Sequence, residues 1–378
     1  MNEKKLYWNL FAGCCLPSKK GNAMLAYFGG PKEIVTADRA EKELFFRLAE
    51  CLSFSEEEKL RLYSVSEKNA YEEYETLEKQ GISFVTQEEE EYPERLRSCA
   101  DAPCYLYYKG VLPKKDELFL AIIGARKCTP YGLETAKILA KSLCAEGIGI
   151  ASGLALGVDC AAHEGALLNG GRTVAVLGCG VDRCYPEANR RIYEQILNSG
   201  GAILSEYPPG TPPLPCFFPQ RNRIIAGICA GIIVTEARKK SGTLITVSLG
   251  LDYGRNIYAV PGRVTDVLSE GCNYLIREGA KPVLSSKDIL EDYPELSKKS
   301  KMKKEGTKTK RYKKIENTLA SDEKIVYASL RLNLQHIEEI QRQTGINPER
   351  LAVILASLEK RGCMKRYGQA YYALSGEE

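Results

Sequence analysis

Seven short apolar segments alternate with amphipathic segments between residues 118 and 285, and this alternation limits the possible fold more than any other feature. The apolar segments are LFLAIIG (118–124), IGIAS (148–152), TVAVLG (173–178), AILSE (202–206), GIIVTEA (231–237), NIYAVPG (256–262) and KPVLS (281–285). Helices are expected between them, over 130–147, 158–169, 187–198 and from Pro219 onward. Nearly all-apolar strands separated by helices are typical of a parallel sheet covered on both faces. The sequence therefore predicts an α/β fold with a Rossmann-like parallel sheet.

Smaller segments flank this core. The sequence of residues 1–67 predicts a small all-helical domain. Its Gly-Gly-Pro turn fits either a helix-hairpin-helix that meets phosphate through backbone N–H groups or a plain helical bundle. Residues 319–378 predict three helices (322–331, 335–343 and 347–361) and a hairpin, which together suggest a winged helix. Asn347-Pro348 suits the start of the third helix, as a cap followed by a first-turn proline.

The formal net charge of +4 is unevenly distributed along the chain. The Rossmann-like segment 68–296 carries 25 basic and 29 acidic residues, whereas residues 297–318 carry ten basic and two acidic ones. The short basic segment has almost no apolar residues, so we expect a flexible linker. It is either a plain solvated tether, which we favour, or a tether that also attracts phosphate. Residues 1–67 and 319–378 are each neutral. A neutral winged helix gives little support for duplex binding, and a protein-contact role is equally open.

Composition and termini exclude several classes of protein. The 14 cysteines are scattered without a Cys-x-x-Cys pair, and the histidines, His163 and His336, stand alone. Structural zinc needs clustered ligands, so we expect no metal, no other cofactor and reduced thiols. No apolar run approaches a membrane span, and the N-terminus lacks the features of a secretion signal. A cytoplasmic location follows as an expectation.

Glycine and basic residues gather in the loops that follow the predicted strands. Ligands bind beyond the carboxyl ends of parallel strands, where these loops converge. Glycine permits close backbone approach, and cations beside helix N-termini favour phosphate. The candidate residues in these loops are Gly124, Arg126, Lys127, Ser152, Gly153, Gly178, Gly180, Arg183, Lys239, Lys240, Ser241, Gly242 and Thr243.

Two familiar phosphate-binding motifs do not account for these loops. The sequence lacks G-x-x-x-x-G-K-[ST], which argues against a P-loop ATPase. Gly178-x-Gly180 imitates half of a dinucleotide fingerprint, but Arg183 occupies the position of the third glycine. This motif alone gives little support to NAD binding.

The segment from Phe217 to Arg223, FFPQRNR, places two arginines and Asn222 in the first turns of a predicted helix. Arginine at a helix N-terminus opposes the macrodipole and needs compensation. One interpretation is anion capture by Arg221 and Arg223, with Phe218 available for base stacking. The other is a salt bridge with Glu206 or Glu236. We favour capture, because Arg126 and Arg183 belong to the same sheet edge.

A second pair of residues, Asp159 and His163, is four apart on a predicted helix. We interpret them as a local hydrogen-bonded pair that fixes the loop after Ser152. The sequence lacks the G-x-S-x-G elbow of a serine hydrolase.

The segment from about Tyr92 to Leu290 resembles the DprA/Smf family of DNA-processing proteins. The resemblance rests on motifs in order: YPERL, Gly124-Ala125-Arg126, SGLALGVDCAAHEGAL, LGCGVDRCYPEAN, LSEYPPGTPP, FPQRNRIIAG, VTEARKKSGTLIT, AVPG and GCNYLIREGA. It implies a non-enzymatic protein that binds single-stranded DNA, forms a homodimer through the Rossmann-like domain and loads RecA during natural transformation. It also implies that Arg126, Gly178, Gly180, Arg221 and Arg223 line the DNA groove, with Arg183, Lys239 and Lys240 as further phosphate contacts.

The sequence departs from the family pattern where Leu156 and Glu164 replace residues that are often basic. These replacements make the groove less positive. With about five phosphates neutralised, log K should fall with log salt at a slope of about −3.5.

Two other functions are open. Nucleotide phosphoribohydrolases bind a monophosphate at a similar edge through G-G-x-G-T-x-x-E, but Thr246 stands here in place of the glutamate. Glu206 and Glu236 are more easily interpreted as partners of the arginines than as a general acid or base. The third function is a scaffold that acts through its winged helix.

Overall fold

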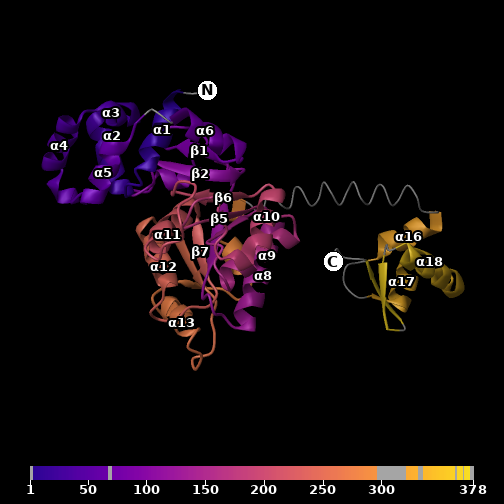
Figure 1. Ribbon diagram of the computed structural model, residues 1–378. Helices are drawn as coiled ribbons and strands as arrows, with labels where there is room; N and C mark the ends of the chain where they lie inside the picture. The colour runs from indigo at the N-terminus through magenta and orange to yellow at the C-terminus, as the bar shows by residue number, and fades with distance from the viewer. Residues whose placement is uncertain are drawn as a thin grey trace. The chain divides into compact units, whose positions relative to one another are not determined.

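A nine-stranded sheet organises residues up to Ser297, with the order β1-β2-β6-β5-β4-β3-β7-β8-β9. Figure 1 labels β1, β2, β6, β5 and β7 of this sheet. Seven strands are parallel and coincide with the seven predicted segments: β3 (Phe119–Ile123), β4 (Gly149–Ser152), β5 (Thr173–Val176), β6 (Ala202–Ser205), β7 (Gly231–Val234), β8 (Asn256–Ala259) and β9 (Lys281–Pro282). The predicted α/β fold is therefore confirmed. β1 (Ser83–Thr86) and β2 (Tyr105–Gly110) extend the sheet in antiparallel pairing and were not predicted.

Helices cover both faces of the sheet because each strand buries alternate side chains on opposite sides. In β3, Ala121 and Ile123 pack in one core, whereas Leu120 and Ile122 pack in another. The first core includes α11 (Phe217–Ile228), α12 (Gly242–Asp252) and α13 (Glu270–Arg277). The opposite face carries α8 (Pro130–Ala145), α9 (Val158–Leu168) and α10 (Arg190–Asn198). The shorter helices are α7 (Glu94–Arg97), η3 (Glu187–Asn189) and α14 (Ser286–Leu290).

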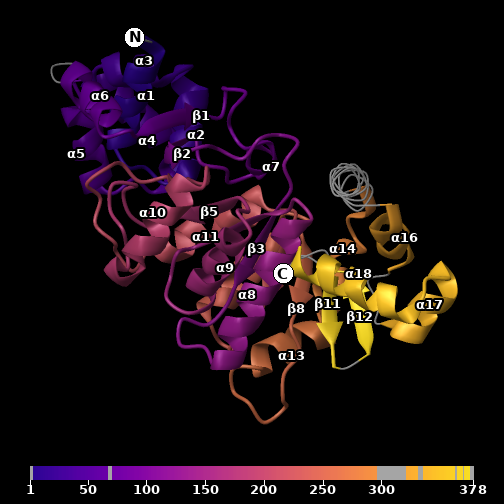
Figure 2. The same ribbon diagram turned by 90° about the vertical axis from the view of Figure 1, so that its right-hand side faces the viewer.

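The N-terminal residues form a helical segment: α1 (Glu3–Gly13), α2 (Ser18–Phe28), α3 (Pro31–Thr36), α4 (Arg39–Leu48), η1 (Glu50–Leu52), α5 (Glu56–Ser64) and α6 (Ala70–Lys79). In both views α1 lies beside β1 and β2 (Figures 1 and 2). The hydroxyl of Tyr107 donates to Asn9 Oδ1 at 2.9 Å, and that of Tyr105 donates to the Ala12 carbonyl at 3.2 Å. The unpredicted strand β2 therefore joins the helical segment to the sheet in one unit.

Residues from Lys298 onward form a second unit. Its elements are α16 (Ser321–Ser329), β10 (Gln335–His336), α17 (Ile337–Thr344), α18 (Pro348–Lys360), β11 (Met364–Tyr367) and β12 (Tyr371–Leu374). Asn347 caps α18, and Pro348 is its first residue, as predicted. The predicted helix from residue 335 instead begins at Ile337, because Gln335 and His336 pair with β12. The winged-helix assignment stays a prediction.

The computed structural model describes residues 3–66, 70–295, 321–330, 335–361, 364–368 and 370–374. The basic segment 297–318, which we expect to be a linker, lies outside these described residues. Across the described part of the chain, no helix is both long and apolar enough to span a bilayer. The same residues contain no cluster of three or more metal-ligating side chains.

Candidate functional site

A cleft of about 740 Å³ opens where the loops after β3, β4 and β7 meet the first turns of α11 and α12. This is the carboxyl edge of the parallel strands, where the sequence predicts the site. Nine of the predicted site residues line it: Gly124, Arg126, Lys127, Phe218, Arg221, Asn222, Ser241, Gly242 and Thr243.

Close backbone packing explains two glycines beside the cleft. A Cβ at Gly124 would lie 2.7 Å from Val158 Cγ2 and 2.9 Å from the Glu236 carbonyl oxygen. Gly157 has φ +80°, and a Cβ there would lie 2.4 Å from the Ala125 carbonyl oxygen. The loops after β3, β4 and β7 therefore touch through their backbones, which fixes the start of the loop that carries Arg126.

Three exposed cations, Arg126, Lys127 and Arg238, line the cleft. Among the described residues, none of them forms an ion pair with a carboxylate. The guanidinium carbon of Arg126 lies 5.3 Å from the centre of the Phe218 ring, a cation–π distance. The Phe218 ring lies 5.6 Å from that of Tyr185. The cleft thus combines unpaired positive charge with an aromatic surface.

The N-terminus of α12 adds anion-binding groups to the same cleft. Ser241 precedes the helix, and its buried Oγ has no hydrogen-bond partner among the residues described. The first-turn N–H groups of an α-helix have no partner within the helix, and its dipole favours negative charge there. Gly242 and Thr243, the first two residues of α12, also line the cleft. This end of α12 can receive a phosphate oxygen.

The sequence predicted that the Arg221 side chain grips phosphate, but Arg221 is only 4% exposed. Its Nη1 donates to the Gly153 carbonyl at 2.7 Å and also to the Val176 carbonyl. Burial lowers the pKa of the Arg221 guanidinium, whereas the neighbouring charge of Asp159 raises it. The prediction of a free anion-capturing Arg221 is therefore wrong: this side chain ties the end of β4 to the end of β5.

The predicted hydrogen bond between Asp159 and His163 is also wrong. Asp159 Oδ2 accepts from the N–H groups of Gly153, at 3.1 Å, and Ala155, at 3.4 Å, so Asp159 does fix the loop after Ser152. His163 Nδ1 instead lies 2.7 Å from Thr173 Oγ1. Burial raises the pKa of Asp159, against the opposing effects of Arg221 and the two amides. Burial and the charge of Arg221 lower the pKa of His163 to about 3.

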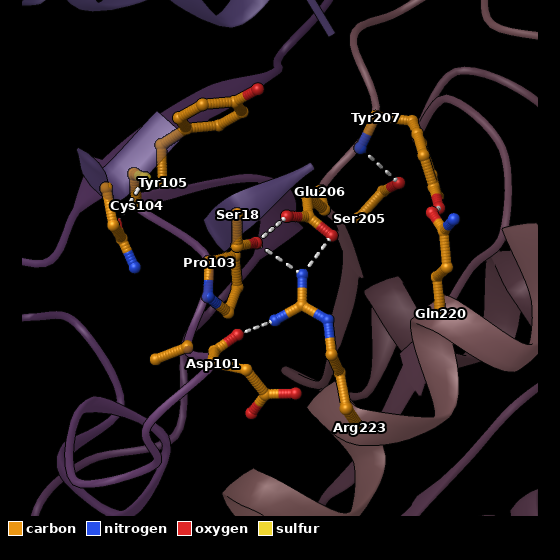
Figure 3. A network of polar contacts seen from close by, with 12 residues as sticks. Ser18, Asp101, Pro103, Cys104, Tyr105, Ser205, Glu206, Tyr207, Gln220 and Arg223 are labelled. Atoms are coloured by element: carbon orange, nitrogen blue, oxygen red, sulfur yellow. Dashed lines mark hydrogen bonds and ion pairs between the residues drawn. The ribbon is translucent and has the colours of Figure 1, made fainter. Parts of the chain in front are cut away.

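Arg223 lies outside the cleft and forms the alternative salt bridge that the sequence left open. Its Nη2 lies 2.5 Å from Glu206 Oε2 and 2.6 Å from Ser18 Oγ (Figure 3). Its Nη1 donates to the Asp101 carbonyl. The expectation that Arg223 lines the phosphate groove is wrong, because its guanidinium is committed to these three partners.

Contrary to expectation, Glu236 forms no ion pair with any arginine that the structure describes. Its carboxylate accepts from Thr129 N–H at 2.8 Å and from Thr129 Oγ1 at 2.5 Å. Thr129 in turn caps α8 by accepting from Gly132 N–H, and Pro130 occupies the first helical position as predicted. Glu236 therefore orders the segment that leads into α8.

Four other predicted residues are buried and do not line the cleft: Ser152, Gly153, Gly178 and Gly180. Ser152 Oγ donates to the Ile122 carbonyl, and the Gly180 N–H donates to the Thr211 carbonyl at 3.1 Å. Gly178 leaves room for Phe218, since a Cβ there would lie 3.0 Å from that ring. These buried residues support the residues that line the cleft, and their expected contact with DNA stays a prediction.

Arg183, Lys239 and Lys240 are exposed but also do not line the cleft. Conversely, the lining residues Arg238 and Tyr185 were absent from the predicted site. Arg238 belongs to the same EARKK run as the two lysines, so its position in the loop was the available signal.

The charges of the cleft suit binding of a polyanion better than acid–base catalysis. Among the described residues that line it, Asp159 is the one carboxylate, and it is buried and held by backbone amides. Thr246 lines the wall at the position where phosphoribohydrolases carry a glutamate. Of the two departures from the family pattern, Leu156 is exposed, and Glu164 pairs with Lys137 at 2.5 Å.

Comparison with known proteins identifies similar chains. The sequence model for DNA recombination-mediator protein A matches residues 83–294, more than half of the chain. DNA processing protein DprA of Streptococcus pneumoniae is 46% identical over 202 residues, which cover 53% of this chain and 71% of that protein.

Two solved structures are also similar. The X-ray structure of S. pneumoniae DprA aligns with a TM-score of 0.64 and 34% identity, covering 77% of this chain and 98% of that one. A structure of DNA processing protein A from Helicobacter pylori, which gives insight into its single-stranded DNA binding mode, aligns with a TM-score of 0.51 and 31% identity. That alignment covers 57% of this chain and 96% of the other.

Proposed function

Because this chain belongs to the DNA recombination-mediator protein A family, we propose that it binds single-stranded DNA in the cleft at the carboxyl edge of its sheet. Phosphates lie against Arg126, Lys127 and Arg238 and against the N-terminus of α12. A base stacks on the aromatic surface formed by Phe218 and Tyr185.

The observation that carries this proposal is the position of Arg126 over Phe218, beside cations that have no carboxylate partner in the described part of the chain. Single-strand binding proteins combine a cationic groove that follows the backbone with aromatic rings that stack on bases, each worth about 1–3 kcal/mol. The stacking surface needs unpaired bases, so duplex DNA satisfies the phosphate contacts alone. The preference for single strands therefore comes from base stacking on Phe218 and Tyr185, and the affinity comes from the cations that contact phosphate.

We further propose that the protein acts without catalysis, as a homodimer that delivers RecA to single-stranded DNA during natural transformation. The cleft supports a binding role, since its carboxylate is committed to backbone amides rather than free for proton transfer. The test of delivery is the rate of RecA filament growth on single-stranded DNA that is coated with a single-strand binding protein. We expect filament growth to be faster when this protein is added.

Binding of a labelled oligo-dT and of a duplex of equal length, measured by fluorescence anisotropy, tests the DNA site. The informative variant combines Arg126→Ala, Lys127→Ala and Arg238→Ala. The matched control combines Lys79→Ala, Lys114→Ala and Lys115→Ala, which removes three exposed charges outside the cleft.

We expect the cleft variant to lose most of its oligo-dT affinity and the control variant to keep it. Equal affinity of both variants would place the DNA elsewhere. Release of free base from AMP or CMP would instead identify a phosphoribohydrolase.

A further inference from the structure

Helix α11 presents two opposite faces to two different cavities. Successive residues of an α-helix are rotated by about 100°, so Arg223 lies about 200° around the axis from Arg221. One face carries Phe218, Arg221 and Asn222 into the cleft. The other carries Phe217, Gln220 and Arg223 into a second cavity of about 380 Å³, which is also lined by the loop that leads into α2.

The rear face of α11 is held at each of its first two turns. The hydroxyl of Tyr207 donates to Gln220 Oε1 at 2.8 Å, and its ring stacks on Phe217 with 4.1 Å between the ring centres. One turn further along, the Arg223 guanidinium binds Glu206 after β6 and Ser18 at the start of α2 (Figure 3). Ser18 Oγ also donates to Glu206 Oε1 at 2.5 Å, which closes the triangle.

We propose that Ser18, Glu206 and Arg223, here termed the α11 clasp, are positioning residues for DNA binding, through which the N-terminal helical segment sets the orientation of α11. The inference rests on the single-stranded DNA binding proposed above. The helical segment acts on the cleft from behind, through the helix that carries Phe218 and Asn222.

Burial separates this role from direct DNA contact. The side chains of Arg223 and Glu206 are only 11% and 10% exposed, and both are already paired. Arg223 would have to abandon Glu206, Ser18 and Asp101 to reach a phosphate, and Glu206 would be left as an unpaired buried charge. On the side of α11 that faces the cleft, Phe218 packs closely against Gly178. A shift of α11 therefore moves the stacking ring.

Glu206→Gln distinguishes the two roles by the sign of its effect. If Arg223 positions α11, loss of the Glu206 charge loosens the clasp and weakens oligo-dT binding, by roughly tenfold. If Arg223 binds phosphate, removal of its competing carboxylate tightens binding and steepens the salt dependence. Glu58→Gln is the matched control, because Glu58 lines the same cavity but pairs with Lys20, at 2.6 Å, and with Ser55 in the helical segment.

Ser18→Ala gives a milder second perturbation that removes no charge. We expect weaker binding with an unchanged slope of log K against log salt, because every phosphate-binding cation remains. Ser64→Ala is the control, since that hydroxyl donates to the Arg61 carbonyl within the same helical segment. The double variant Ser18→Ala/Glu206→Gln should bind little worse than Glu206→Gln alone, as expected for one coupled network.

Anisotropy titrations at a temperature well below the unfolding transition of each variant separate binding from stability. Wild-type affinity in both clasp variants would overturn the proposal, even if both unfold earlier on heating. Tighter binding by Glu206→Gln would overturn it as well. Failure of the wild type to bind oligo-dT would instead refute the proposed function itself.

Discussion

The salt dependence of binding gives the sharpest test of which cations hold the DNA. The buried positions of Arg221 and Arg223 remove them from the phosphate count, and three exposed cations remain in the cleft. Each neutralised phosphate of a single strand contributes about −0.7 to the slope of log K against log salt. Three contacts give a slope of about −2.1, clearly flatter than the value of about −3.5 expected from the sequence.

Arg126→Ala should remove one of these contacts and flatten the slope to about −1.4. Between about 50 and 200 mM salt, the wild type would then lose affinity about 18-fold, and the variant about sevenfold. The variant also loses the contact of Arg126 with Phe218. Its affinity should therefore be lower at every salt concentration as well as less salt-dependent.

Arg126→Lys separates the two contributions. The charge remains, so the slope should stay near about −2.1. The planar contact on Phe218 is weakened, and a loss of about 0.5–1 kcal/mol corresponds to a salt-independent decrease in affinity of roughly two- to fivefold. Anisotropy titrations of a labelled oligo-dT over a salt series measure both quantities. An unchanged slope in Arg126→Ala would refute a phosphate contact at this residue.

Three further predictions concern stability and stacking. Burial lowers the pKa of His163 in the folded protein to about 3, whereas its pKa in the unfolded chain is about 6.5. The free energy of unfolding should therefore fall as the pH drops below about 6.5, by about 2 kcal/mol at pH 5. In His163→Gln, the midpoint of urea unfolding should change less between pH 7 and pH 5 than it does in the wild type. Gly153→Ala places a Cβ 2.5 Å from Arg221 Nη2 and should lower the free energy of unfolding by about 2 kcal/mol or more. In Gly242→Ala the new Cβ meets nothing within 4 Å, so this control variant should melt at nearly the wild-type temperature. Phe218→Leu should weaken oligo-dT binding by about 1–3 kcal/mol and leave duplex binding unchanged, and equal losses for both would contradict stacking.

The sequence predicted the parallel sheet well because β3, β4, β5, β6 and β7 are buried along their whole length and so appear as short apolar runs. β2, Tyr105–Gly110, begins with tyrosines and a leucine but ends in Lys109 and Gly110, and it precedes the strands and helices that alternate regularly. Its sequence YLYYKG acquires a strand role from distant partners: β6 pairs with it, and the hydroxyls of Tyr105 and Tyr107 bind α1. Local pattern does not contain those partners, so the strand that joins the helical segment to the sheet was missed.

The same distinction explains the candidate site. Strand ends converge by topology, so the loops that carry Arg126, Lys127 and Thr243 were correctly placed at one edge. The direction of each side chain depends on neighbours far along the chain. Helical periodicity alone indicates that Arg221 and Arg223 point to opposite sides of α11 and cannot grip the same phosphate. Ser18 and Glu206 bind Arg223 on the side of the helix that faces away from the cleft, and neither residue is near α11 in the sequence. Two arginines in one motif therefore form structural contacts around the cleft, and in the proposed function the exposed cations of the neighbouring loops bind the DNA.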